Sequence, residues 1–165
     1  MNGARIIKHL TMTHWHVNRH FPSAVLTAIE NAIKLAERTH TGEICFAVEG
    51  ALHTRSLRIG QSARERAVEV FSQLRIWDTQ HNNGVLIYLL LADRDVEIVA
   101  DRGIDPKVGK QGWENICRHM ENAFRQGHYQ QGVIDGINAV AEQLARYFPA
   151  SEVDHNELPD RPVIL

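Results

Sequence analysis

DTQHNNGVLIYLLLADRDVEIVADRG, residues 78–103, is the stretch that decides the fold of this chain. Its first apolar run, residues 85–92, is nearly continuous, which is typical of a strand that is buried on both faces of an α/β sheet. A second run, residues 96–100, follows after Asp93, Arg94 and Asp95. Because this polar triplet is short enough for a tight turn, the two runs are predicted to form a β-hairpin.

The rest of the chain supplies one further strand and several helices. Residues 43–49 alternate apolar side chains between two faces, as a strand does. Ser62 and Glu65 have the spacing of a capping box, which marks the start of a helix. Helices are predicted where apolar residues recur every three or four positions, at residues 21–39, 62–77, 111–126 and 130–147.

The order of these elements predicts the fold class. A strand, a helix and a second strand in succession form a crossover, which makes strands 43–49 and 85–92 parallel when they share a sheet. The hairpin then adds an antiparallel strand. We therefore expect an α/β fold, a three-layer α/β/α sandwich with a small mixed sheet of three to four strands.

Two terminal segments flank this domain, so that the expected organisation is a lead-in at residues 1–20, a domain at 21–148 and a polar tail at 149–165. The tail is expected to be poorly ordered, although its last residues, 163–165, could dock on an apolar surface. His14 and His16 in the lead-in could form part of a zinc site. The spacing fixes no third ligand, and the alternative is a lead-in helix that packs on the domain.

Composition narrows the class of protein. The formal net charge of the 165 residues is −2 with histidine neutral, so the chain lacks the overall positive charge of nucleic-acid-binding proteins. The longest apolar run, residues 85–92, is far shorter than the roughly 20 residues that span a bilayer, and the N-terminus has no signal-peptide pattern. Cys45 and Cys117 lie in apolar patterns and are expected to be buried, reduced and unlinked. These features favour a cytoplasmic location.

Polar residues gather at one end of the predicted sheet. The starts of the two parallel strands bring Glu43 and Asn83 together, and the end of the hairpin brings Asp101 to the same edge, where Asp78 and Asp105 can also reach. Carboxylate and amide oxygens are the ligands that Ca²⁺ and Mg²⁺ prefer. The sequence therefore predicts a candidate metal site made of these five residues.

A purely structural network is the alternative for this edge, because Arg75 and Arg102 are available to pair with the acidic side chains. The NNG sequence also indicates an unusual backbone angle at Asn83 or Gly84, since asparagine and glycine tolerate positive φ. No nucleophile motif of the G-x-S-x-G, phosphate-binding-loop or C-x₅-R type occurs. A phosphatase built on this chain would therefore need a metal-bound water.

Three sequence segments together resemble the TPM-domain family. They are NNGVLIYLLLADRDVEIVADRGI at residues 82–104, TGE at 41–43 and GHYQQG at 127–132, and the similarity runs from about residue 21 to residue 148. The resemblance is to a cytoplasmic bacterial type, whereas many members of the family are secreted or membrane-anchored. It implies calcium binding, a phosphatase activity and a LemA-type membrane protein as partner.

Residues and resemblance together predict a non-catalytic or weakly catalytic TPM-like module that binds a protein partner. Binding of a divalent cation, Ca²⁺ or Mg²⁺, is a further expectation. The alternative is a metal-dependent phosphatase that uses the Glu/Asp/Asn cluster at the sheet edge. No nucleic acid is expected as a partner, and no segment is expected to span a membrane.

Overall fold

A four-stranded mixed sheet lies at the centre of the computed structural model, which describes residues 3–151 and 155–165. The strand order is β3-β2-β1-β4. β1 and β2 are parallel, with Glu43 opposite Gly84, and β2 and β3 form the predicted antiparallel hairpin, with Val85 opposite Ala100. β1 and β2 are buried along their whole length because they lie inside the sheet. The strands are β1 (Glu43–Glu49), β2 (Gly84–Leu90), β3 (Asp95–Ala100) and β4 (Val163–Ile164).

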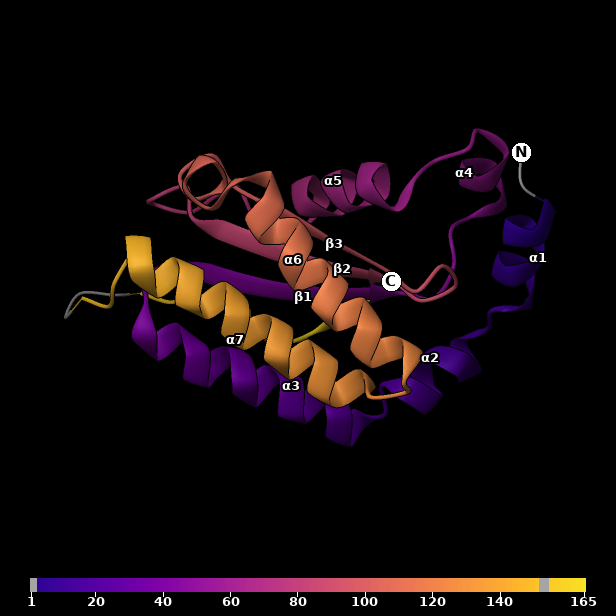
Figure 1. Ribbon diagram of the computed structural model, residues 1–165, viewed down its shortest axis with the longest axis horizontal. Coiled ribbons are helices and arrows are strands. Elements are labelled where there is room, and N and C mark those ends of the chain that lie inside the picture. Colours follow the sequence, from indigo (N-terminus) through magenta and orange to yellow (C-terminus); the bar gives the residue numbers. More distant parts are fainter. Residues whose placement is uncertain (1–2, 152–154) are drawn as a thin grey trace.

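Helices cover both faces of the sheet, as Figure 1 shows. One face packs on α5 through a core that includes Ala47, Tyr88 and Phe71. The other face packs on α3, α6 and α7 through a larger core that includes Phe46 and Ile87. The predicted α/β fold with three layers and a small mixed sheet is therefore confirmed. The covering helices are α3 (Ser23–Ala36), α5 (Ala63–Gln73), α6 (Asp105–Arg125) and α7 (Tyr129–Tyr147).

Local sequence sets the ends of these helices. At the start of α5 the Glu65 amide donates to Ser62 Oγ at 3.1 Å, and the Ser62 amide donates to Glu65 Oε2 at 2.7 Å, which is the predicted capping box. α6 begins at Asp105, six residues before the helix that was predicted at residues 111–126. Gly109 interrupts that helix with a φ of 75°, a conformation that glycine adopts without steric cost.

Residues 3–20 contain two short helices, α1 (Gly3–Thr11) and α2 (His14–His20), as in the packed-helix alternative. His9 fixes α1 to the domain. Its buried ring accepts the Leu52 amide at Nδ1 over 3.0 Å, and its Nε2 lies 3.1 Å from Asp93 Oδ1.

Arg5 fixes α1 to the same carboxylate, because its Nε lies 2.9 Å from Asp93 Oδ2. In α2, the His16 ring accepts the Thr13 amide at 3.3 Å and so caps the helix. The segment between β1 and α5 contains the short helix α4 (Thr54–Arg58). Across residues 3–151 and 155–165, no helix is long and apolar enough to cross a membrane.

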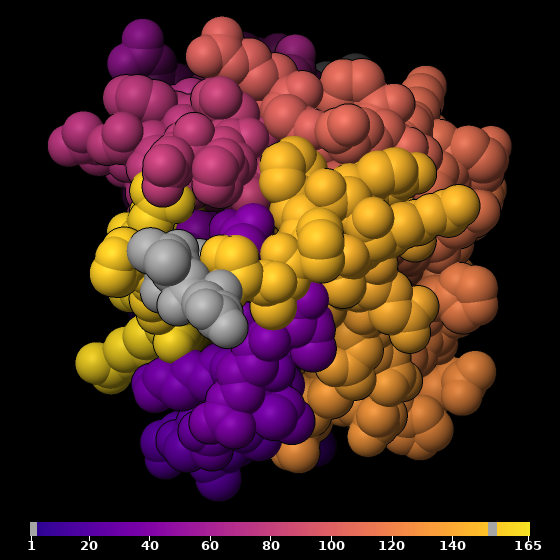
Figure 2. Space-filling view, turned by 90° about the vertical axis from the view of Figure 1, so that its left-hand side faces the viewer, coloured from indigo at the N-terminus to yellow at the C-terminus, as the bar shows by residue number. Residues whose placement is uncertain are grey.

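The C-terminal segment completes the sheet. β4 pairs in parallel with β1, and the Leu165 amide donates to the Val48 carbonyl at 3.0 Å. The expectation of a poorly ordered tail is therefore wrong for residues 155–165, and the predicted docking of residues 163–165 is confirmed. Residues 152–154 of the predicted tail and 1–2 of the lead-in lie outside the described residues. In Figure 2 the yellow C-terminal segment lies on the surface between the magenta region around α5 and the indigo α3.

Side chains occupy the outer edge of β3. The Arg64 guanidinium donates through Nη1 to the Ile98 carbonyl, and the Val96 amide donates to Glu121 Oε1 at 3.2 Å. These two bonds use backbone groups that face away from β2. The other edge of the sheet is the two-residue strand β4.

Candidate functional site

The polar strand ends meet at one end of the sheet. Glu43 lies opposite Gly84 in the parallel register, and the Asp101 amide donates to the Gly84 carbonyl at 2.9 Å. Figure 2 views the molecule from this end. The segments at residues 41–43, 82–84 and 101–103 are therefore neighbours, as the order of strands requires.

Three of the five predicted ligands are engaged in separate contacts. Glu43 accepts the backbone amides of Glu157 and Leu158, at 2.9 and 3.2 Å, so its carboxylate anchors the C-terminal segment. Asp78 is exposed and pairs with Arg75 at 2.8 Å. Within residues 3–151 and 155–165, no group of three or more His, Cys, Asp or Glu side chains could hold a metal ion.

Asp105, the third of these residues, accepts a hydrogen bond from Trp113 Nε1 at 2.9 Å. Its backbone amide also donates to the Asp101 carbonyl at 2.9 Å. Asp105 is therefore the first residue of α6, and its side chain is directed along that helix to Trp113.

Asn83 and Asp101 differ from the other three predicted ligands because one side-chain oxygen of each makes no hydrogen bond within the described part of the chain. Asn83 donates through Nδ2 to the Thr41 carbonyl at 3.1 Å, and Asp101 Oδ1 accepts the Arg102 amide at 2.7 Å. The second oxygens, Asn83 Oδ1 and Asp101 Oδ2, are buried and have no hydrogen-bond partner in the described part of the chain. Two hard oxygen donors thus remain at this end of the sheet.

Close backbone packing positions these two residues. A Cβ on Gly84 would lie 2.2 Å from the Ile76 carbonyl oxygen, and a Cβ on Gly103 would lie 2.4 Å from that of Asn82. The unusual backbone angle is at Asn82, with a φ of 52°, and not at Asn83 or Gly84 as predicted. Glycine is therefore required at Gly84 because of the close approach of the chain that leaves α5.

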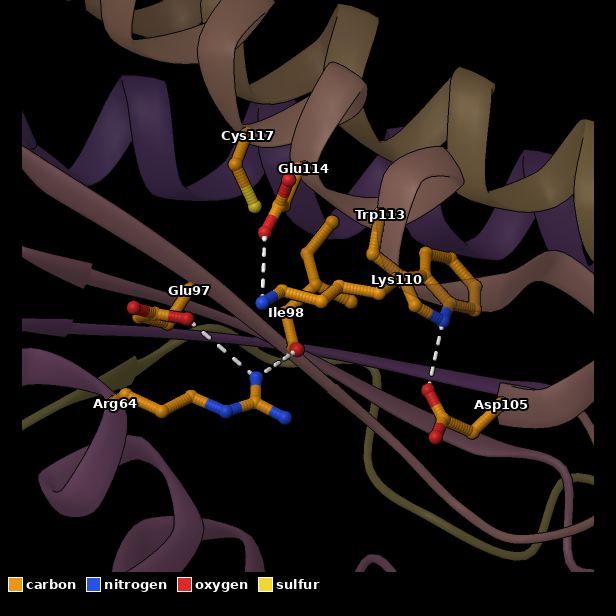
Figure 3. A pocket seen from close by; sticks show the side chains of 8 residues that line it. All are labelled: Arg64, Glu97, Ile98, Asp105, Lys110, Trp113, Glu114 and Cys117. Atoms are coloured by element: carbon orange, nitrogen blue, oxygen red, sulfur yellow. Dashed lines mark hydrogen bonds and ion pairs between the residues drawn. The ribbon is translucent and has the colours of Figure 1, made fainter.

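A cavity of about 510 Å³ lies between α5, β3 and α6, with Asp105 at one side (Figure 3). Trp113 forms one wall, and Ile98 of β3 contributes another side. Two pairs of opposite charge line the cavity, because Arg64 lies 3.4 Å from Glu97 Oε2 and Lys110 lies 3.7 Å from Glu114 Oε1. The fifth charged residue, Asp105, bonds to the Trp113 indole, so the lining has one more carboxylate than cations.

The cysteines do not supply a nucleophile. Cys117 lines this cavity, but burial, followed by the charge of Glu97, raises the pKa of its thiol to about 12. Burial likewise raises the pKa of Cys45 to about 12. Both are buried and free, as predicted. The thiolate, which is the nucleophilic form, is therefore scarce at neutral pH.

Sequence reasoning missed a second cavity of about 370 Å³, which is lined in part by Glu37. Burial, followed by the charges of Glu43 and Asp160, raises the pKa of Glu37 to about 9. Its Oε1 accepts the Ile44 amide at 2.9 Å. The only signal in the sequence was an acid at the end of a helical apolar stripe, which is common on helix surfaces.

The comparisons with known proteins agree with the fold. Residues 20–143 match the TPM domain. The BA42 protein from the psychrophilic bacterium Bizionia argentinensis is 32% identical, with a TM-score of 0.76 over 87% of this chain and 94% of that chain. The N-terminal domain of a P. gingivalis protein shares the fold, with 20% identity and a TM-score of 0.60 over 82% of this chain and 81% of that one. No curated protein matches.

The TPM match carries the family assignment, since it spans well over half of the 165 residues. The 32% identity to the BA42 protein extends over most of both chains and supports it. The predicted resemblance is confirmed, and the chain belongs to the TPM domain family.

Proposed function

We propose that this protein is a binding module that holds a divalent cation at Asn83 and Asp101, without strong catalytic turnover, and presents a surface to a protein partner. The observation that carries the cation part is the pair of buried oxygens, Asn83 Oδ1 and Asp101 Oδ2, that have no hydrogen-bond partner among the described residues. Such atoms are few in native proteins, and a bound ion is one of the standard explanations for them. A carboxylate and an amide oxygen together suit Ca²⁺ or Mg²⁺.

A cation would also offset the cost of burying Asp101. An ionised carboxylate loses hydration when it is buried, and only one of its oxygens accepts a bond here, from the Arg102 amide. Backbone carbonyls and solvent would complete the coordination shell, because Ca²⁺ takes 6–8 oxygen ligands. The cation would stabilise the folded state by mass action.

Calorimetric titration with Ca²⁺ and Mg²⁺, paired with thermal melts, tests this proposal. We expect a saturable binding heat and a rise in Tm with cation concentration, and both should be lost in Asp101→Asn. Asp135→Asn is the matched control, because Asp135 lies on α7 and pairs with Gln131. Asp78→Asn and Asp105→Asn measure whether the other predicted ligands contribute. Coincident melts of the unchanged protein in millimolar cation and in chelator would refute the cation part.

Trp77 carries the partner-binding part of the proposal. Its side chain is exposed on the segment between α5 and β2, and the Arg75 guanidinium lies 5.6 Å from its ring centroid. Tryptophan and arginine are the residues that most often dominate protein interfaces. Family resemblance suggests a LemA-type membrane protein as the partner. Binding of that protein in detergent should weaken at least tenfold in Trp77→Ala but not in Trp15→Ala, and equal binding by both variants would argue against Trp77.

A metal-dependent phosphatase is the second candidate, and the cavity beside Asp105 is the observation that favours it. The cavity is lined by Asp105, whose amide donates to the Asp101 carbonyl. At about 510 Å³ it has room for a small phosphate ester. With the cysteine pKa values near 12, a metal-bound water would have to be the nucleophile. Release of phosphate from an aryl phosphate should then require Ca²⁺ or Mg²⁺ and disappear in Asp101→Asn. Absence of release with either cation would remove this candidate.

A further inference from the structure

Two stretches of the sequence contain basic residues and no acidic ones. No Asp or Glu occurs before Glu30, and none occurs between Glu49 and Glu65. This is unusual in a chain with 20 acidic and 18 basic residues. The Lys and Arg residues in the two stretches are Arg5, Lys8 and Arg19 in the first and Arg55, Arg58 and Arg64 in the second.

The fold brings most of these residues to one end of the molecule. The Leu52 amide donates to His9 Nδ1 at 3.0 Å, and Arg5 Nη1 donates to the Gln61 carbonyl at 2.9 Å, so α1 is bonded to both sides of the α4 segment. Figure 1 shows α1, α2 and α4 together at the right-hand end, beyond the last residues of β1 and β2. Asn83 and Asp101 lie at the opposite end of the sheet.

Large apolar side chains are exposed among these basic residues. Four of them, on α1, on α2 and just after α4, are between 60% and 76% exposed. Trp15 also carries Arg19, whose guanidinium carbon lies 5.3 Å from the centroid of the indole ring. These four side chains belong to Ile7, Leu10, Trp15 and Ile59.

Two acids near this end, Asp93 and Glu49, have partners within the domain. Asp93 contacts Arg5 and His9. Glu49 is buried and accepts Arg66 Nε at 2.8 Å and Tyr88 Oη at 2.7 Å. For Lys8, Arg55 and Arg58 the described residues supply no ion pair. We call this surface the basic end, and we define it by Ile7, Lys8, Leu10, Trp15, Arg19, Arg55, Arg58 and Ile59.

We infer that the basic end docks on an anionic membrane surface. Positive side chains are attracted to acidic headgroups, and exposed Ile, Leu and Trp side chains gain by entering the interface between headgroups and acyl chains. Neither feature suffices alone: a nucleic acid would use the cations but leave the aliphatic side chains in water. Lipid is the partner that satisfies both, and it is separate from the cation and partner sites proposed above.

Flotation with vesicles tests the inference on the full chain. Vesicles of phosphatidylcholine with an equal amount of phosphatidylglycerol should carry the protein at 50 mM salt, and vesicles of phosphatidylcholine alone should not. Raising the salt to 500 mM should release most of it, because screening shortens the range of the attraction. Failure to float with the anionic vesicles at low salt, or equal flotation with both kinds, would overturn the inference.

Matched variants separate the two contributions. Arg55→Gln with Arg58→Gln should lower the partition coefficient by about 30-fold, since each basic residue near an anionic surface contributes about fivefold. Arg38→Gln with Arg146→Gln removes two exposed charges near the opposite end of the sheet and should change little. Far-ultraviolet circular dichroism and Tm establish that each variant is folded. Equal losses in the two double variants would contradict the assignment to the basic end.

The apolar part has an equally close control. Leu10 and Leu35 are both 64% exposed, but Leu35 lies on α3, outside the basic end. Leu10→Ser should reduce vesicle binding severalfold, whereas Leu35→Ser should not. Binding of duplex DNA that matches vesicle binding in its need for Arg55 and Arg58, with Leu10→Ser vesicle binding unchanged, would show a general polyanion site and overturn the lipid assignment.

Discussion

Glu37 is a partly buried acid whose ionisation works against folding. Burial raises the pKa of its carboxyl from 4.5 to about 9, so the folded protein keeps a proton that the unfolded chain releases. The folded state therefore binds more protons between these two values, and stability is greatest below the lower one. We expect the free energy of unfolding to fall as the pH rises from about 5 to about 9, by at most about 1.4 kcal/mol per pH unit.

Glu37→Gln tests this dependence. The amide oxygen can still accept the Ile44 amide, but the side chain no longer titrates. The variant should show a flatter dependence of stability on pH in urea-denaturation series between pH 5 and pH 9. Glu142→Gln, at an exposed position on α7, is the control and should leave the slope unchanged. Parallel curves for Glu37→Gln and the unchanged protein would contradict the assignment.

Position 84 requires glycine because the neighbouring backbone leaves no room for a side chain. Because a Cβ there would lie 2.2 Å from the Ile76 carbonyl oxygen, the backbone must shift in any variant with a side chain. We expect Gly84→Ala to lose about 1–3 kcal/mol of stability in chemical denaturation. Gly3→Ala is the control, since a Cβ on Gly3 has nothing within 4 Å. A stability for Gly84→Ala equal to that of the unchanged protein would show that the β2 entrance tolerates a side chain.

Sequence patterns could predict burial at this scale but not the direction of polar side chains. Cys45 and Cys117 were predicted to be buried because both lie in apolar patterns. Glu43 was predicted to point into a metal cluster, whereas it binds the amides of Glu157 and Leu158. A contact between residues more than a hundred positions apart leaves no trace in local spacing.

At the scale of elements, α5 depends on Ser62, the residue that caps its N-terminus. Ser62 and Glu65 satisfy each other's amides, so Ser62→Ala leaves the Glu65 amide without its acceptor. We expect a loss of about 1 kcal/mol of stability. Thermal denaturation of Ser62→Ala, with Ser56→Ala as a serine control in the short helix α4, measures it. If both variants melt together, the cap contributes nothing beyond what water supplies.

β4 has only two residues, yet we expect its removal to lower the stability of the whole domain. Removal of residues 163–165 eliminates the bond from the Leu165 amide to Val48 and the pairing of Val163 with Ala47. The truncated chain should melt about 3–6 °C lower in thermal denaturation. Ile164→Ser keeps the backbone pairing and should lose less than the truncation does. A truncated chain that melts with the full one would mean that the strand adds no stability.

Elements with a clear period were predictable, and those without one were not. The β2 and β3 strands and the four long helices each show an apolar repeat or run that extends over several residues. Helix α4 and strand β4, with five and two residues, are too short to show any period. The start of α6 was missed because Gly109 interrupts it, and a glycine normally signals the end of a helix.

At the scale of the whole molecule, topology explains both what was predictable about the candidate site and what was not. The order of strands alone brings Glu43, Asn83 and Asp101 to one end of the sheet. Which of them remain available for a ligand depends on the C-terminal segment and on Trp113, which engage Glu43 and Asp105. The basic end lies at the other end of the sheet, so the proposed cation site and the proposed lipid surface face opposite ways.

The two side chains that occupy the outer edge of β3 affect the tendency of the protein to aggregate. An open edge strand is a template on which a second molecule can continue the sheet, and repeated addition gives amyloid fibrils. Arg64 and Glu121 bond to the Ile98 carbonyl and the Val96 amide that such an addition would need. On the opposite side β4 covers β1 only at Ala47 and Val48, and the Ile44 amide of β1 donates to Glu37 Oε1. Side-chain contacts on the backbone of β3 therefore oppose fibril growth from that edge, which matters because β2 beside it is an uncharged apolar run.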